Sequence, residues 1–216
     1  MKIVTIIPAR GGSKGIPRKN LIDVCGKPLI QYAIEASKKS QVDETWVSSD
    51  DDEILSVASE LGAFPLKRPA KLATDMATSE SALLHFAENV DFDVLIFIQA
   101  TSPLITADDI NRSISALKKY DSVVAVTQNS QLFWEGNSPL YDLSSRKRRQ
   151  DSADSYLEVG SLFATTRCNL LKSRNRLSGK LYLLKVPKKR AFDIDSYEDL
   201  ELVKILINSG VLDTNE

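Results

Sequence analysis

Four cationic side chains gather in a glycine-rich stretch near the N-terminus: Arg10, Lys14, Arg18 and Lys19. Three glycines lie among them, and a β-branched apolar run over residues 3–7 comes just before them. Arginine and lysine side chains bind phosphate oxygens, and glycine lets the backbone approach a ligand closely. The stretch therefore predicts a site for a phosphate-rich ligand. The alternative is a tight glycine turn with solvated cations.

The glycine spacing distinguishes this stretch from the better-known phosphate loops. Gly11, Gly12 and Gly15 fit neither G-x-x-x-x-G-K-[ST] nor G-x-G-x-x-G. Pro17 also prevents a helix from following at once. A phosphate bound here would therefore be held by a loop of another kind.

Two acids stand one residue apart near the C-terminus, in the sequence Asp193-Ile194-Asp195. In extended backbone alternate side chains share a face, so both carboxylates point one way and Ile194 points into the core. Two hard oxygen ligands suit Mg²⁺, which binds one or two carboxylates together with phosphates and waters. The alternative is that Asp195 or Ser196 only caps the last helix, as Ser196-x-x-Asp199 allows.

Alternating strand and helix patterns predict the scaffold that would position these residues. Apolar runs predict strands at residues 3–7, 45–48, 64–66, 94–98, 122–126, 160–165 and 180–186. Helical spacing and capping residues predict helices at residues 29–37, 51–61, 79–88, from 106 onward, and 197–208. This alternation predicts an α/β fold, a three-layer α/β/α Rossmann-like sandwich with a mainly parallel mixed sheet. Ligands bind such sheets beyond the carboxyl ends of the strands, where the N-terminal loop must lie.

Length and composition indicate a single globular domain over residues 1–216. The alternation of strand and helix patterns stops at residues 127–155, a polar stretch that we interpret as an insertion. Hydrophobic residues make up 43% of the chain, and a net charge of -1 favours neither nucleic acid nor a membrane as partner. Two cysteines and the lack of a long apolar run favour a cytoplasmic protein.

Residues 8–21, P-A-R-G-G-S-K-G-I-P-R-K-N-L, resemble the signature loop of the sialic acid (acylneuraminate) cytidylyltransferases, in the nucleotide-diphosphosugar transferase superfamily. The resemblance extends to residues 47–50, 68–79, 99–104 and 149–151 and to the acid pair. It implies the α/β fold of that superfamily. It also implies transfer of a cytidylyl group from CTP to the anomeric hydroxyl of a sialic-acid-like nonulosonic acid, with release of pyrophosphate.

The same resemblance implies roles for individual residues. The catalytic residues would be Arg10, Lys19 and Asp195. The nucleotide-binding residues would be Ala9, Arg10, Ser13, Lys14, Lys19, Asn20, Arg68, Ala77 and Ser79. The sugar would contact Gln99, Arg149 and Phe163, and Mg²⁺ would bind Asp193 and Asp195. The insertion at 127–155 would reach the second subunit of a homodimer and help complete the sugar site; an ordinary solvated loop is the alternative.

The chain departs from the family pattern at the strand that faces the sugar. Members that use N-acetylneuraminate have arginine, proline, asparagine and glycine there, then a tyrosine; this chain has Leu157, Glu158, Val159, Gly160 and Phe163. Hydrogen-bonding groups for a polar acyl sugar are missing, and each unpaired buried polar group costs ~1–3 kcal/mol. The sequence therefore leaves the identity of the acceptor sugar open. It also leaves open two other functions: nucleotidyl transfer with another nucleotide or acceptor, and nucleotide-sugar binding without catalysis.

Overall fold

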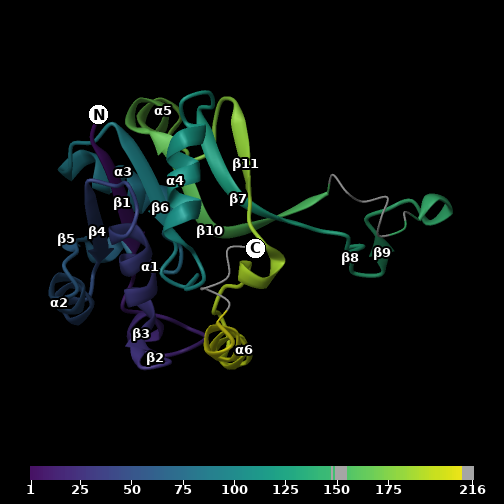
Figure 1. The fold of residues 1–216 in the computed structure, drawn as a ribbon, viewed down its shortest axis with the longest axis horizontal. Coiled ribbons are helices and arrows are strands. Elements are labelled where there is room, and N and C mark those ends of the chain that lie inside the picture. The colour runs from purple at the N-terminus through teal and green to yellow at the C-terminus, as the bar shows by residue number, and fades with distance from the viewer. Residues whose placement is uncertain (147, 149–154, 211–216) are drawn as a thin grey trace.

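A seven-stranded sheet forms the centre of the protein in the computed structural model, which describes residues 1–146, 148 and 155–210 (Figure 1). The strands of this sheet are β1 (Ile3–Pro8), β4 (Glu44–Ser49), β5 (Phe64–Lys67), β6 (Val94–Ile98), β7 (Ser122–Gln128), β10 (Tyr156–Thr166) and β11 (Leu181–Lys185). The helices are α1 (Leu29–Lys38), α2 (Asp52–Glu60), α3 (Ser79–Asn89), α4 (Ala107–Ala116), α5 (Arg167–Ser173) and α6 (Tyr197–Asn208). The strand order is β11-β7-β10-β6-β1-β4-β5.

Only β10 runs against its neighbours in this sheet. It pairs antiparallel with β6 and β7, whereas β1 pairs parallel with β4 and β6, β4 with β5, and β11 with β7. The carboxyl ends of β1, β4, β5 and β6 consequently lie along one edge of the sheet. The prediction of a mainly parallel mixed sheet is confirmed.

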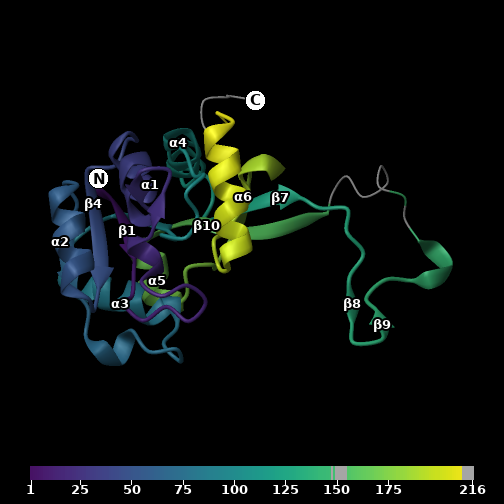
Figure 2. The same ribbon diagram turned by 90° about the horizontal axis from the view of Figure 1, so that it is seen from below.

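Helices cover both faces of the sheet (Figure 2). One face packs against α1, α2 and α4 through residues such as Ile7, Val47 and Ile96, and the other packs against α3 and α5 through Ile6 and Phe97. All five residues of β6 are buried, which explains their continuous apolar character. The predicted three-layer α/β/α sandwich is therefore confirmed.

Local capping signals fix several of the helix starts. The Asp51 side chain accepts from two backbone amides of the first turn of α2. Thr106 and Asp109 form a capping box at α4, and Ser196 and Asp199 form another at α6. Because these interactions lie within four residues, the sequence alone located the corresponding helices well.

A third, smaller core holds α6 against a short hairpin made of β2 (Asp23–Val24) and β3 (Lys27–Pro28). Leu29 and Tyr32 of α1 join this core, together with Ile194, which is fully buried between the two acids of the predicted pair. The predicted inward direction of Ile194 is thus confirmed. This core ties the end of the chain to the region just after the N-terminal loop.

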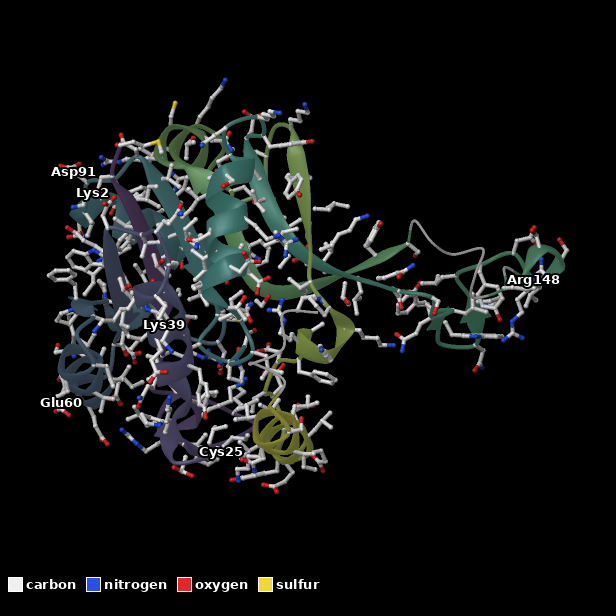
Figure 3. All side chains as sticks on the ribbon, viewed as in Figure 1. Lys2, Cys25, Lys39, Glu60, Asp91 and Arg148 are labelled. Atoms are coloured by element: carbon white, nitrogen blue, oxygen red, sulfur yellow. The ribbon has the colours of Figure 1, made fainter. Side chains whose placement is uncertain are left out.

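Most of the predicted insertion projects from the sheet as an arm, the segment between β7 and β10 (Figures 1 and 2). The arm contains β8 (Trp134–Glu135), β9 (Ser138–Pro139) and the 3-10 turn Leu143–Ser145, and Figure 3 places Arg148 at its far end. Phe133, Trp134, Leu140 and Leu143 on the arm are each at least 46% exposed. Across the whole described chain, no helix has both the length and the apolar character needed to cross a membrane.

Candidate active site

A cavity of ≈ 570 Å³ opens at the carboxyl edge of β1 and β6. Four segments that are distant in sequence line it: the N-terminal loop, the segment before α3, the end of β6 and the acid pair. Eleven of the predicted site residues are among the lining residues: Arg10, Ser13, Lys14, Lys19, Asn20, Arg68, Ala77, Ser79, Gln99, Asp193 and Asp195. The expected position beyond the strand ends is therefore where these residues meet.

The N-terminal loop and the acid pair touch directly. The Lys19 ammonium donates to the Asp195 carboxylate (2.7 Å) and to the Ile194 carbonyl oxygen (2.7 Å), and the Lys19 side chain is only 13% exposed. Gly15 is in contact with the same segment, because a methyl group at that position would collide with the carbonyl oxygen of Asp195. A cationic side chain and an anionic side chain from opposite ends of the chain thus meet at one wall of the cavity.

Hydrogen bonds within the protein hold the N-terminal loop in place. The buried Asn20 side chain donates to the carbonyl oxygen of Arg10 (2.9 Å). The Gly11 amide donates to the Asp50 side chain at the end of β4 (3.0 Å), so this amide already has an anionic partner within the protein. The backbone amide of Gly11 is therefore committed to the scaffold.

Two of these cations share one carboxylate in the structure. Asp75 accepts from Arg10 at 2.9 Å and from Lys14 at 2.8 Å. Lys14 makes the largest contribution to holding the pKa of the Asp75 carboxyl below its usual value, and Arg10 adds to it. A carboxylate therefore lies where the cations would meet the phosphates of a ligand.

Arg68 is a buried cation in the wall of the cavity. It is 5% exposed, and its Nε atom has no hydrogen-bond partner among the described residues. Burial lowers the pKa of this guanidinium, whereas the nearby Asp50 carboxylate raises it. A buried donor without a partner costs about 1–3 kcal/mol, so the site is suited to a ligand that supplies an acceptor there.

The acid pair offers two carboxylates to the same cavity. Burial, with a smaller contribution from Asp195, raises the pKa of Asp193, while a hydrogen bond from Thr101 opposes this. A cation bound beside Asp193 would offset the cost of burying its charge. No cluster of three or more His, Cys, Asp or Glu suited to a metal occurs in the described part of the chain. The donor set fits Mg²⁺, whose remaining positions are commonly filled by phosphate oxygens and waters.

A buried ion pair positions the acid pair. The backbone N–H of Ile194 donates to the carbonyl oxygen of Thr101 (2.9 Å). Four residues before Ile194, the Arg190 side chain pairs with Asp109, a fully buried residue at the start of α4. The Arg190 guanidinium also donates to the carbonyl oxygen of Leu104 (3.3 Å), so it is bound within the protein scaffold.

The helix-cap alternative for the acid pair is also resolved by the hydrogen bonds. Ser196 is the cap residue of α6, and its side chain and that of Asp199 form the capping box. The Asp195 backbone N–H donates to Asp199 (3.1 Å), whereas the Asp195 carboxylate binds Lys19. The cap and the cavity therefore use different groups of neighbouring residues.

Two of the predicted site residues that the structure describes, Ala9 and Phe163, are not on the cavity wall. Ala9 is 1% exposed and its amide donates to the Ser48 carbonyl oxygen (2.9 Å). Phe163 is also 1% exposed, and its ring stacks on that of Phe97 with 5.5 Å between the two centroids. Phe97 does line the cavity. Arg149 lies outside the described residues. Ala9 and Phe163 therefore lie behind the wall and support the groups that face the ligand.

Sequence reasoning missed Arg176, which supports the same wall from behind. Its guanidinium lies 4.4 Å from the ring centroid of Phe163 and 5.5 Å from that of Phe97. It also pairs with Glu80 in the first turn of α3 (2.7 Å), next to the cavity residue Ser79. No local pattern marks this arginine, because its partners come from β6, β10 and α3 and meet only in the folded protein.

A cation-lined cavity faced by two carboxylates, at the carboxyl edge of a mainly parallel sheet, is suited to a phosphate-bearing ligand, and together with the family match below it marks the protein as a nucleotidyltransferase. The cytidylyltransferase family profile matches residues 4–206. The chain belongs to the cytidylyltransferase family.

Two relatives illustrate its place within the family. Pseudaminic acid cytidylyltransferase of Campylobacter jejuni is 34% identical over an alignment that covers 95% of this chain and 96% of the relative. N-acylneuraminate cytidylyltransferase B of Danio rerio is 33% identical, over 88% of this chain and 48% of the longer relative. The resemblance to sialic acid cytidylyltransferases drawn from the sequence motifs is thereby confirmed.

Solved structures extend the likeness in fold. A CMP:2-keto-3-deoxy-manno-octonic acid synthetase complexed with CTP superposes with a TM-score of 0.75 at 20% identity, covering 97% of this chain and all (100%) of the other. The 2-C-methyl-D-erythritol 4-phosphate cytidylyltransferase of Thermus thermophilus gives a TM-score of 0.69 at 17% identity, over 96% and 100% of the two chains. At these identities the likeness shows the fold alone.

Proposed function

We propose that the protein transfers a cytidylyl group from CTP to the anomeric hydroxyl of a sialic-acid-like nonulosonic acid. The sugar oxygen attacks the α-phosphorus, the bond to the bridging oxygen breaks, and pyrophosphate leaves. The contact between Lys19 and Asp195 carries the proposal, because it joins the cationic loop to the acid pair across one cavity. Names of relatives such as pseudaminic acid cytidylyltransferase support the same reaction.

The cationic loop would hold the triphosphate. Arg10, Lys14 and Lys19 all line the cavity, so phosphate groups bound there would meet positive charge. Such positioned cations lower the energy of charge that develops as the leaving group departs. Arg10 and Lys19 are accordingly our candidates for catalysis, and Ser13 and Asn20 complete the phosphate wall.

The segment before α3 would receive the nucleoside. Arg68, with its unpaired buried Nε, would donate to an oxygen of the base or ribose, and Ala77 and Ser79 would lie against the base. Small side chains at these two positions leave room for a planar ring. The same segment matches the family motif that was recognised in the sequence.

Asp193 and Asp195 would bind Mg²⁺. The bound ion would supply positive charge to the α-phosphate and lower the pKa of the attacking hydroxyl. Asp195 would also keep Lys19 oriented, since their hydrogen bond is 2.7 Å long. The buried Ile194 would hold both carboxylates towards the cavity.

The acceptor sugar would lie between the end of β6 and β10. Gln99 lines the cavity there, and Gly160 of β10 packs closely on it, because a methyl group at Gly160 would lie 3.4 Å from the Gln99 amide nitrogen. Phe163 would act through the Phe97 ring that it supports. The lack of the N-acetylneuraminate motif at residues 157–160 favours a related nonulosonic acid.

A nucleotide-by-sugar matrix tests the proposal. The protein is incubated with Mg²⁺, one of CTP, UTP, GTP or ATP, and one of a panel of nonulosonic acids, and pyrophosphate release and product mass are measured. We expect turnover with CTP and at least one acid sugar, and rates about a hundredfold lower with the other nucleotides. Equal use of all four nucleotides, or no turnover with any acid sugar, would contradict the proposal.

We also propose that the protein is cytoplasmic and that the arm joins two copies of the chain into a homodimer. Phe133 and Leu143 are among the exposed apolar side chains that such contact would cover. Sedimentation should show a dimer, and replacing both residues by serine should shift it to monomer. Leu181→Ser, at an exposed position on β11, is the matched control and should leave the dimer intact. A monomeric wild-type protein would rule out the proposal.

A further inference from the structure

Asp75 occupies a position that the proposed reaction needs for phosphate. One of its carboxylate oxygens is 2.9 Å from Arg10 and the other is 2.8 Å from Lys14. Both cations line the cavity, and so does Asp75. An arginine or lysine can bind a carboxylate or a phosphate with the same donors, so a phosphate group that takes the donors now bound to Asp75 displaces its carboxylate.

The segment that carries Asp75 is built to let the carboxylate move. Residues 73–77 form neither helix nor strand, and Met76 beside it is 90% exposed. Arg10 is 35% exposed and Lys14 is 76% exposed, so both ion pairs face water. Exposed pairs of this kind are weak and exchange readily with other anions.

We propose that Asp75 promotes release of pyrophosphate by competing with it for Arg10 and Lys14. This inference rests on the proposed function. Pyrophosphate and the β- and γ-phosphates of CTP would bind these two cations, whereas CMP has no phosphate beyond the α-position. Asp75 therefore weakens the binding of pyrophosphate and CTP and leaves that of CMP unaffected. Once the bond to the α-phosphorus has broken, return of the carboxylate to the two cations drives the leaving group out.

The test compares the binding of three ligands to wild type and to Asp75→Asn. Calorimetry in the presence of EDTA measures affinity for pyrophosphate, CTP and CMP without metal. In the variant we expect pyrophosphate and CTP to bind about tenfold more tightly, as the loss of two exposed ion pairs allows, and CMP to bind equally well. In turnover with Mg²⁺, pyrophosphate should inhibit the variant at correspondingly lower concentration.

The control separates exchange at the two cations from a general change in charge. Asp50→Asn likewise removes one negative charge, from a carboxylate that lies near the cavity residue Arg68. The asparagine side-chain oxygen can still accept the hydrogen bond from the Gly11 amide. Equal tightening in both variants, or unchanged pyrophosphate affinity in Asp75→Asn, would overturn the role of Asp75. Failure of wild type to bind CTP at all would instead overturn the proposed function.

Discussion

Replacing Asp195 by asparagine should reduce cytidylyl transfer by about a thousandfold, the loss typical when a charge partner of the transition state is removed. The substitution removes a negative charge from the acid pair and weakens the hold on Lys19, which now lies 2.7 Å from the carboxylate. Release of pyrophosphate from CTP at saturating Mg²⁺ and sugar measures the effect. Because Asp195 is on the surface of the cavity, the unfolding midpoint should stay close to that of wild type.

Glu198→Gln is the matched control for this variant. Glu198 is an exposed carboxylate in the first turn of α6, three positions after Asp195, and it does not line the cavity. It should turn over like wild type. Near-normal activity of Asp195→Asn in excess Mg²⁺ would remove the acid pair from the proposed metal site.

Lys19→Ala should lower kcat by about a hundredfold while leaving the KM for the sugar nearly unchanged. The ammonium of Lys19 is held in position by Asp195 and by the carbonyl oxygen of Ile194, so it can meet phosphate charge without rearrangement. Steady-state kinetics with CTP and sugar varied separately will distinguish the two constants.

Lys27→Ala tests whether the loss of any paired lysine has the same effect. Lys27 is close to Lys19 in the sequence but does not line the cavity, and its ammonium pairs with the Glu35 carboxylate at 2.9 Å. The control should have wild-type rates. A rise confined to the KM for the sugar in Lys19→Ala would place this lysine outside the phosphate site.

The parts of the fold that depend on neighbouring residues were predictable from the sequence. The final helix was predicted at residues 197–208 and α6 has those bounds, because the Ser196–Asp199 box is a local signal. The buried run of β6 was equally clear, since every residue in it is apolar. In contrast, the two-residue strands β2 and β3 and the seven-residue helix α5 are too short for periodicity to reveal.

The candidate site was predictable in its membership more than in its contacts. Motif positions correctly gathered Arg10, Lys19 and Asp195 at one cavity. They did not reveal that Phe163 lies behind Phe97, because the direction of a side chain in β10 depends on the bulge between Glu158 and Phe163. Nor did they assign Arg190, whose partner Asp109 lies in α4, 81 positions earlier in the chain.

The pairing of Lys19 with Asp195 has a consequence for how the enzyme is made. The cations proposed to bind the polyphosphate are synthesised first, and the acids are synthesised only after the last strand of the sheet, since Asp195 follows β11. A nascent chain that stops after β11 would contain the cations without the acids. On the proposed mechanism, a copy shortened after β11 would therefore lack the metal-binding acids and would not transfer a cytidylyl group.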